Sequence, residues 1–67
     1  MKKYMFYYNA KSTDGTLYNG NIFISLFGLS METIQQTVNT LVKDFTKKGL
    51  DLLPESVSFS FIIQLDE

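Results

Sequence analysis

The sequence predicts a small α+β domain in which one helix packs on one face of a three-stranded antiparallel sheet. Three observations favour this fold class. Residues 31–48 carry apolar side chains at helical spacing, two strand-like runs before them flank a turn, and a last run over 56–65 alternates apolar with polar residues. At 67 residues the chain has room for one domain only. We therefore expect a single domain over residues 1–67 with the element order β-β-α-β.

The first strand is expected over about residues 3–11, where aromatic residues are dense and favour strand formation. Both of its faces are apolar, with Tyr4, Phe6 and Tyr8 on one and Met5 and Tyr7 on the other. A strand with two apolar faces is usually central in its sheet. The second strand, over about 16–27, follows through a turn at residues 12–15, so the two strands form a hairpin.

The length of the turn decides which residues of the hairpin share a face. A two-residue Asp-Gly turn sets Phe6 opposite Phe23, whereas a three-residue turn with a left-handed Gly15 sets Phe6 opposite Ile22. The three-residue turn gathers the bulky side chains on one face, and we prefer it for that reason. Asn19-Gly20 is a candidate bulge that would change the register halfway along the second strand.

The helix is expected over about residues 31–48. Its apolar residues fall within one stripe about 100° wide, as in a surface helix that packs on a core: Met31, Ile34, Val38, Leu41, Val42 and Phe45. Ser30 is placed to cap the N-terminus. Gly49 is placed to end the helix in a left-handed conformation, with Leu50 folded back onto Phe45 as in a Schellman motif.

The last strand is expected over about residues 56–65, after a connection whose leucines close the end of the core and whose Pro54 stops regular structure. Its apolar residues alternate with mostly polar ones, which predicts one core face and one solvated face: Val57, Phe59, Phe61, Ile63 and Leu65. A crossover through a helix returns this strand parallel to the second strand. With the first strand between them, all neighbours are antiparallel and the strand order is 2-1-3.

A single helix covers one face of such a sheet and leaves the other face open. The expected apolar residues of the covered face are Tyr4, Phe6, Tyr8, Ile22, Ile24, Val57, Phe59, Phe61 and Ile63. On the open face we expect Met5, Tyr7, Phe23 and Ile62 among polar residues. Contiguous apolar surface usually marks an interaction site in a small protein, so these four are the candidate partner-binding residues. The alternative is an ordinary sheet surface that tolerates a few apolar side chains.

The composition argues against catalysis. The chain has no cysteine and no histidine, so it lacks thiolate nucleophiles, disulfides, the usual general base at neutral pH and the commonest nitrogen ligand of zinc. Its acidic residues are scattered along the chain, so we expect neither an acid–base pair nor a metal site. We predict a non-enzymatic protein with no catalytic residues and no cofactor.

The expected function is that of a protein-interaction module, which binds a second copy as a homodimer or another protein through the open face or an edge strand. One alternative is binding of single-stranded nucleic acid by stacking on Tyr7 and Phe23, but the near-zero net charge and the lack of arginine count against it. Another is an accessory protein of a phage or mobile element that inhibits a host complex. No run is long enough to span a membrane, and we expect a cytoplasmic protein.

Overall fold

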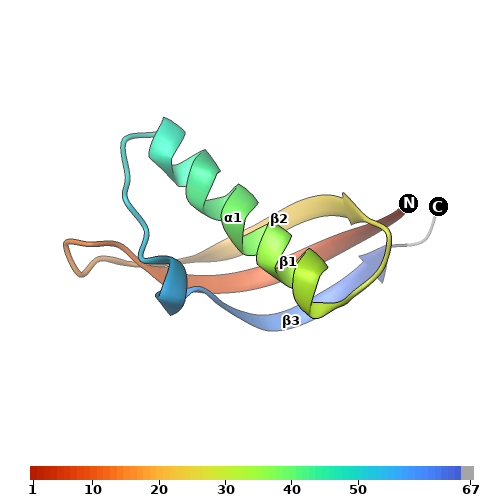
Figure 1. Ribbon diagram of the computed structural model, residues 1–67. Helices are drawn as coiled ribbons and strands as arrows, with labels where there is room; N and C mark the ends of the chain where they lie inside the picture. Colours follow the sequence, from red (N-terminus) through yellow and green to blue (C-terminus); the bar gives the residue numbers. More distant parts are fainter. Residues whose placement is uncertain (66–67) are drawn as a thin grey trace.

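The computed structural model describes residues 1–65, which form three strands, one α-helix and a short 3₁₀ turn. The strands are β1 (Lys2–Lys11), β2 (Leu17–Leu26) and β3 (Ser58–Leu65), the helix is α1 (Met31–Lys47), and the 3₁₀ turn is η1 (Pro54–Ser56). The sheet order is β2-β1-β3 and both pairs of neighbours are antiparallel, as predicted. Figure 1 shows α1 running diagonally along one side of this sheet.

The turn between β1 and β2 has the predicted three-residue geometry. The Ser12 amide donates to the Thr16 carbonyl over 2.9 Å, and the Gly15 amide donates to the Ser12 carbonyl over 3.0 Å. Gly15 has a φ of 90°, in the left-handed region that glycine occupies without steric cost. The Asp14 carboxylate accepts hydrogen bonds from the Ser12 hydroxyl and from the Thr16 amide. These bonds set the register at the start of the hairpin.

From this turn the pairing of β1 with β2 continues to the far end without a shift. Phe6 lies opposite Ile22, as the three-residue turn predicts. The candidate bulge at Asn19-Gly20 does not form, because Gly20 pairs directly with Tyr8. A Cβ on Gly20 would lie 3.0 Å from the Tyr8 hydroxyl oxygen, so the glycine makes room for an aromatic ring instead of kinking the strand.

Both ends of α1 form as predicted. The Ser30 hydroxyl accepts from the Thr33 amide over 3.2 Å, and the Thr33 hydroxyl accepts from the Ser30 amide over 2.8 Å, which completes a capping box. At the other end Gly49 has a φ of 81°, and the Leu50 amide donates to the Phe45 carbonyl over 2.9 Å, as in a Schellman motif. The caps therefore place α1 where the sequence predicts it.

The face that α1 turns toward the sheet differs from the predicted apolar stripe. Met31 is almost fully exposed, so its predicted place in the core is wrong. Thr37, which lies outside that stripe, is fully buried, and its hydroxyl donates to the Thr33 carbonyl over 2.9 Å. Because this bond satisfies the hydroxyl inside the helix, burying Thr37 leaves no polar group unpaired. The buried side of α1 is thus rotated toward Thr37 and away from Met31.

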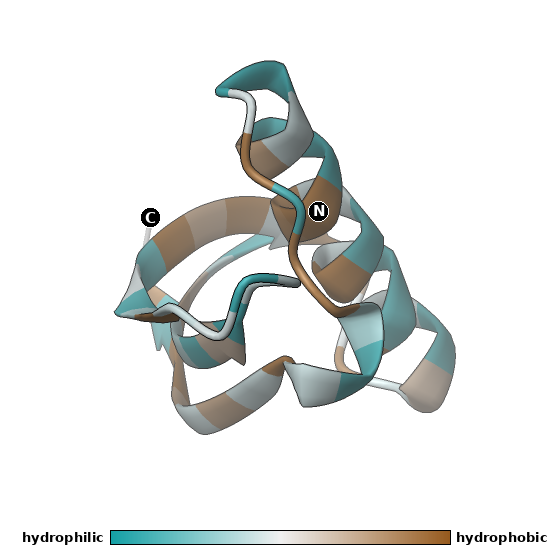
Figure 2. Cartoon of the chain, turned by 90° about the vertical axis from the view of Figure 1, so that its left-hand side faces the viewer, coloured by the Kyte–Doolittle hydropathy of each residue, from teal (hydrophilic) through white to brown (hydrophobic). Residues whose placement is uncertain are grey.

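The core between α1 and the sheet consists of two clusters that share Ile22, and Figure 2 shows the helix along one side of the curved sheet. The cluster toward the hairpin turn contains Ala10, Leu41, Phe45 and Leu52, with Tyr8, Tyr18, Ile22, Val42, Leu50 and Val57 against it. The other cluster contains Tyr4, Phe6 and Leu26, with Ile22, Ile24, Ile34, Phe59 and Ile62 against it. Edge-to-face rings fill both, since the Phe45 and Tyr18 centroids are 5.3 Å apart and the Phe6 and Phe59 centroids 4.8 Å apart.

The connection between α1 and β3 is fastened to the end of β1. Leu52 is buried and forms an isolated antiparallel bridge with Ser12, so a leucine of the connection closes the end of the core as predicted. The Lys11 amide donates to the Ser56 hydroxyl over 2.9 Å. Pro54 begins η1, a position that proline favours because the first amide of a helical turn has no partner to lose. These contacts hold the start of β3 beside β1.

β3 contains a bulge at Ser60. Tyr8 of β1 pairs with Phe59, but the preceding residue, Tyr7, pairs with Phe61. Ser60 is therefore an extra residue in β3, and its hydroxyl reaches the Tyr7 carbonyl over a long 3.4 Å. Because side chains alternate along a strand, one extra residue exchanges the two faces for every residue after it.

The bulge corrects the predicted placement of the last strand. Phe61, Ile63 and Leu65 lie on the face turned away from α1, so the prediction that Phe61 and Ile63 lie under the helix, with Leu65 on the same core face, is wrong. Ile62 pairs with Phe6 and packs against the second core cluster, so its predicted place on the open face is wrong as well. Up to Phe59 the predicted alternation holds.

Candidate functional site

The candidate site is the sheet face opposite α1, which we call the open face. Strand pairing assigns its side chains, since directly paired residues point to the same side of a sheet. They are Lys3, Met5, Tyr7, Asn9 and Lys11 of β1, Leu17, Asn19, Asn21, Phe23 and Ser25 of β2, and Ser58, Phe61, Ile63 and Leu65 of β3. No helix formed by residues 1–65 packs on this face, because α1 occupies the other one.

Six apolar side chains form a contiguous patch on the open face, and all three strands contribute to it. We call it the open-face patch: Met5, Tyr7, Phe23, Phe61, Ile63 and Leu65. Its exposed members leave large fractions of their surface accessible, 64% for Phe23, 51% for Phe61, 39% for Ile63 and 38% for Tyr7. Contiguous apolar exposure of this extent is typical of interaction sites.

The arrangement of the patch follows from the two registers of β1. Met5 lies opposite Phe23 of β2 and opposite Ile63 of β3, so its unbranched side chain lies between a phenylalanine and an isoleucine. Tyr7 lies opposite Phe61, and their rings are 4.9 Å apart between centroids with a tilt of 31°. The two rings pack against each other, and this contact limits the movement of both side chains on the patch.

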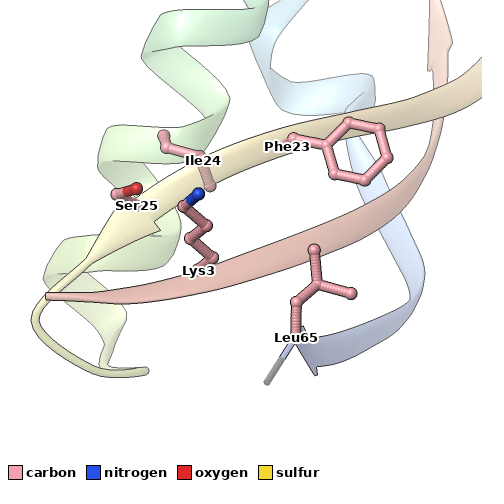
Figure 3. A pocket seen from close by; sticks show the side chains of 5 residues that line it. All are labelled: Lys3, Phe23, Ile24, Ser25 and Leu65. Carbon is pink, nitrogen blue, oxygen red and sulfur yellow. The ribbon is translucent and has the colours of Figure 1, made fainter. Parts of the chain in front are cut away.

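A shallow hollow lies at the end of the patch where Lys3 emerges, with a volume of about 380 Å³. Figure 3 shows Lys3 on the middle strand, Phe23 on one outer strand and Leu65 on the other. Ile24 and Ser25 complete the lining. Its walls suit an apolar side chain from a partner, with the lysine ammonium at the rim.

The remainder of the open face is mostly polar, and its charges lie at the two ends of β1. Beyond the patch it presents Leu17 and the charged side chains of Lys3 and Lys11, together with asparagine and serine side chains: Asn9, Asn19, Asn21, Ser25 and Ser58. Serine and asparagine keep hydrogen-bonding capacity at low desolvation cost, whereas an unpaired charge is costly to bury. The centre of this face therefore has no charge that a partner would need to neutralise.

Three of the four predicted site residues lie together on this face. Met5, Tyr7 and Phe23 are members of the patch, while Ile62 lies in the core. The sequence interpretation missed Phe61, Ile63 and Leu65, because it continued the alternation of the last run through Ser60. The observation that could have found them is that this alternation places five large apolar residues of one edge strand on the core face, which a single helix can hardly cover.

A second exposed apolar group lies in the connection between β2 and α1 and is separate from the open face. Phe27, Leu29 and Met31 are all exposed there. They belong to one short segment and a helix start, whereas the open-face patch spans three paired strands. The patch is therefore the more rigidly positioned of the two apolar surfaces.

Asp14 is held by hydrogen bonds within the hairpin turn. The hydrogen bond from the Ser12 hydroxyl, followed by the bond from the Thr16 amide, lowers the pKa of Asp14 to about 2. This carboxylate lies in the hairpin turn, where its role is structural. Over the described part of the chain, acidic side chains do not gather into a group of three or more that could hold a metal ion.

Comparison with known proteins gives no relative on which to base a function. No protein-family model matches the chain, and no curated protein or solved structure is significantly similar to it. In residues 1–65 no helix has both the length and the apolar character needed to cross a membrane.

Proposed function

We propose that this protein is a non-catalytic interaction module that associates with a second copy of itself through the open face. The observation that carries the proposal is the open-face patch, which places six apolar side chains from three strands on the face that α1 does not cover. A sheet packed on one side only is completed when a second layer covers the other side. A second copy supplies that layer with the same surface.

The size of the patch supports this occupant. The three aromatic members expose 38–64% of their surface, which at about 200 Å² per aromatic side chain amounts to roughly 300 Å². Ile63 adds to this apolar area with 39% of its surface exposed, and the partly buried Met5 and Leu65 adjoin it. Specific interfaces begin at roughly 500 Å² per partner, and the polar neighbours on the same face add to the apolar area toward that value.

The charge of the face also favours self-association. Two identical surfaces repel each other when charges lie at their centre, but here the centre is aromatic and aliphatic and the charges of Lys3 and Lys11 lie at opposite ends. Small domains bury a small share of their surface on folding, so pairing of two copies is a common source of added stability. The apolar centre of the face and the small size of the domain therefore both favour a second copy as the partner.

Sedimentation equilibrium across micromolar to millimolar concentrations tests the proposal. We expect a monomer–dimer equilibrium that Phe23→Ser combined with Phe61→Ser weakens by at least tenfold. The control is Met31→Ser, which removes an even more exposed apolar side chain outside the open face and is expected to leave the equilibrium unchanged. A chain that stays monomeric at millimolar concentration contradicts the proposal, as does an equal effect of the control.

The Tyr7 and Phe61 rings beside Phe23 favour one second candidate, which is binding of single-stranded nucleic acid. Sheet-based modules stack bases on exposed rings of this kind. The open face offers two lysines, Lys3 and Lys11 at opposite ends of β1, so electrostatic support is weak. A fluorescence titration with oligothymidine separates the two candidates: affinity tighter than micromolar that is lost in Tyr7→Ala favours the nucleic acid, and absence of such binding favours self-association.

A further inference from the structure

β3 has two possible registers on β1, and the structure shows one of them. As far as the pair Tyr8–Phe59 the strand follows an uninterrupted alternation. Beyond the bulge at Ser60 the pairing is displaced by one residue, so that Met5 lies opposite Ile63. Without the bulge, continuing the Tyr8–Phe59 alignment would place Met5 opposite Ile62.

The two registers differ in which apolar side chains reach the surface. A slip of one residue moves each side chain after the bulge to the other face. In the observed register Phe61 and Ile63 are exposed on the open face, while Ile62 lies in the core. In the slipped register Phe61 would face α1 opposite Phe6, and Ile62 would face outward. The slip therefore removes Phe61 and Ile63 of β3 from the open-face patch.

Opposing contributions distinguish the two registers. The slipped register would bury Phe61 and Ile63 and remove the bulge at Ser60, which favours it, but it would expose Ile62, which opposes it. It also forces a phenylalanine into the place of Ile62, next to the edge-to-face rings of Phe6 and Phe59, and overpacking of this kind is destabilising. β3 is an edge strand that pairs with β1 alone, so few other contacts need to change.

We propose that the part of β3 after Ser60 exchanges between these two registers, and that self-association through the open face selects the observed one. This inference rests on the proposed function. A second copy gains the apolar surface of Phe61, Ile63 and Leu65 only in the observed register, and this difference in affinity shifts the population toward it. The bulge thereby makes the interaction surface conditional on the partner.

Cross-strand NMR contacts in the wild-type chain provide the first test. In the dilute monomer we expect backbone contacts of Met5 with both Ile62 and Ile63, or exchange broadening confined to residues 60–65. At concentrations where the dimer forms, the Met5–Ile63 contacts alone are expected to remain. A dilute monomer with only the Met5–Ile63 contacts and no exchange overturns the proposal.

Deletion of Ser60 provides the second test, because it removes the extra residue while keeping Phe61 and Ile63 on the open face. If the two registers of the wild-type monomer are equally populated, each partner gains about a factor of two, and the dimer dissociation constant falls about fourfold. Ser60→Ala keeps the extra residue and serves as the control, with no change expected. An unchanged dissociation constant in the deletion variant overturns the proposal.

Ile62→Gln tests the same equilibrium without shortening the chain. Glutamine is poorly placed in the core and is tolerated on the outer face, so the variant favours the slipped register. We expect Met5 contacts with residue 62 to dominate and self-association to weaken by at least tenfold. Strong Met5–Ile63 contacts and unchanged association in this variant contradict the proposal.

The outcomes also separate this inference from the proposed function. If the chain shows both registers but never dimerises, the exchange between registers stands, and the proposal that a second copy selects one of them is refuted. A chain that dimerises through the open face but shows one register when dilute retains the proposed function and refutes the slip.

Discussion

The two outer strands flank the same central strand but are positioned by different means. β2 continues directly from a three-residue turn that Gly15 and Asp14 hold, and it pairs with β1 along its whole length without a shift. β3 arrives after a helix and a connection, and its register shifts by one residue at Ser60. A turn fixes register locally, whereas a strand that returns from a long crossover takes its register from side-chain packing. Where the side chains of a strand can pack in two ways, the strand can have apolar side chains on its exposed face.

The largest expected effect comes from Phe6, which both outer strands share. Phe6 is fully buried on β1 and lies opposite Ile22 of β2 and Ile62 of β3. Phe6→Ala is expected to cost about 3–5 kcal/mol of unfolding free energy, which a domain this small can hardly tolerate. Urea unfolding followed by circular dichroism measures it. Phe23→Ala on the open face is the control, and a similar loss there at monomer concentrations would show that the two faces are not distinct.

Neighbouring isoleucines of β3 test the bulge. Ile62 packs in the core and Ile63 is exposed on the open face. Ile62→Ala is expected to lower the unfolding free energy by about 2 kcal/mol, and Ile63→Ala by less than about 1 kcal/mol. Both substitutions remove the same atoms, so denaturant midpoints of the two variants at low protein concentration compare their positions directly. The reverse order of effects would place the bulge elsewhere.

Gly15 of the hairpin turn and Gly28 of the connection between β2 and α1 form a matched pair of glycines. Gly15→Ala forces an alanine into a positive φ and is expected to cost about 1–2 kcal/mol, with the loss concentrated in the pairing of β1 with β2. Gly28→Ala has open space around the added Cβ and a φ outside the positive region, so a smaller change is expected. Thermal unfolding ranks the two variants. Equal effects would mean that the turn does not need its left-handed residue.

The smallest expected effect is the loss of stability when Asp14 is protonated at low pH. The folded-state pKa of Asp14 is about 2, below its ordinary value of 3.8, so its ionised form stabilises the hairpin turn. This contribution is fully present above about pH 4 and is lost as the pH falls from 3.8 through about 2. The difference in stability between the wild type and Asp14→Asn is expected to shrink over that interval. A difference that is the same at pH 2 and pH 5 would contradict this role.

Local signals in the sequence predict most of the fold. Ser30, Gly15 and Gly49 each act within a few residues, and their caps and turn form as their chemistry requires. The open face and three of its apolar residues also follow from the hairpin register. The outward side of β3 does not, because the choice between Phe61 and Ile62 depends on how large side chains fit beneath α1. Alternation alone contains no information about that fit.

The hydrogen bond from the Lys11 amide to the Ser56 hydroxyl anchors the chain just before β3 begins at Ser58. At the far end of β3, beyond the bulge, Leu65 pairs with Lys3 of β1. Amide protons near the anchor are therefore expected to exchange with deuterium mainly when the whole domain unfolds, and those beyond Ser60 through brief local opening. The extra residue at Ser60 is therefore expected to mark a drop in the protection of amide protons from exchange along β3.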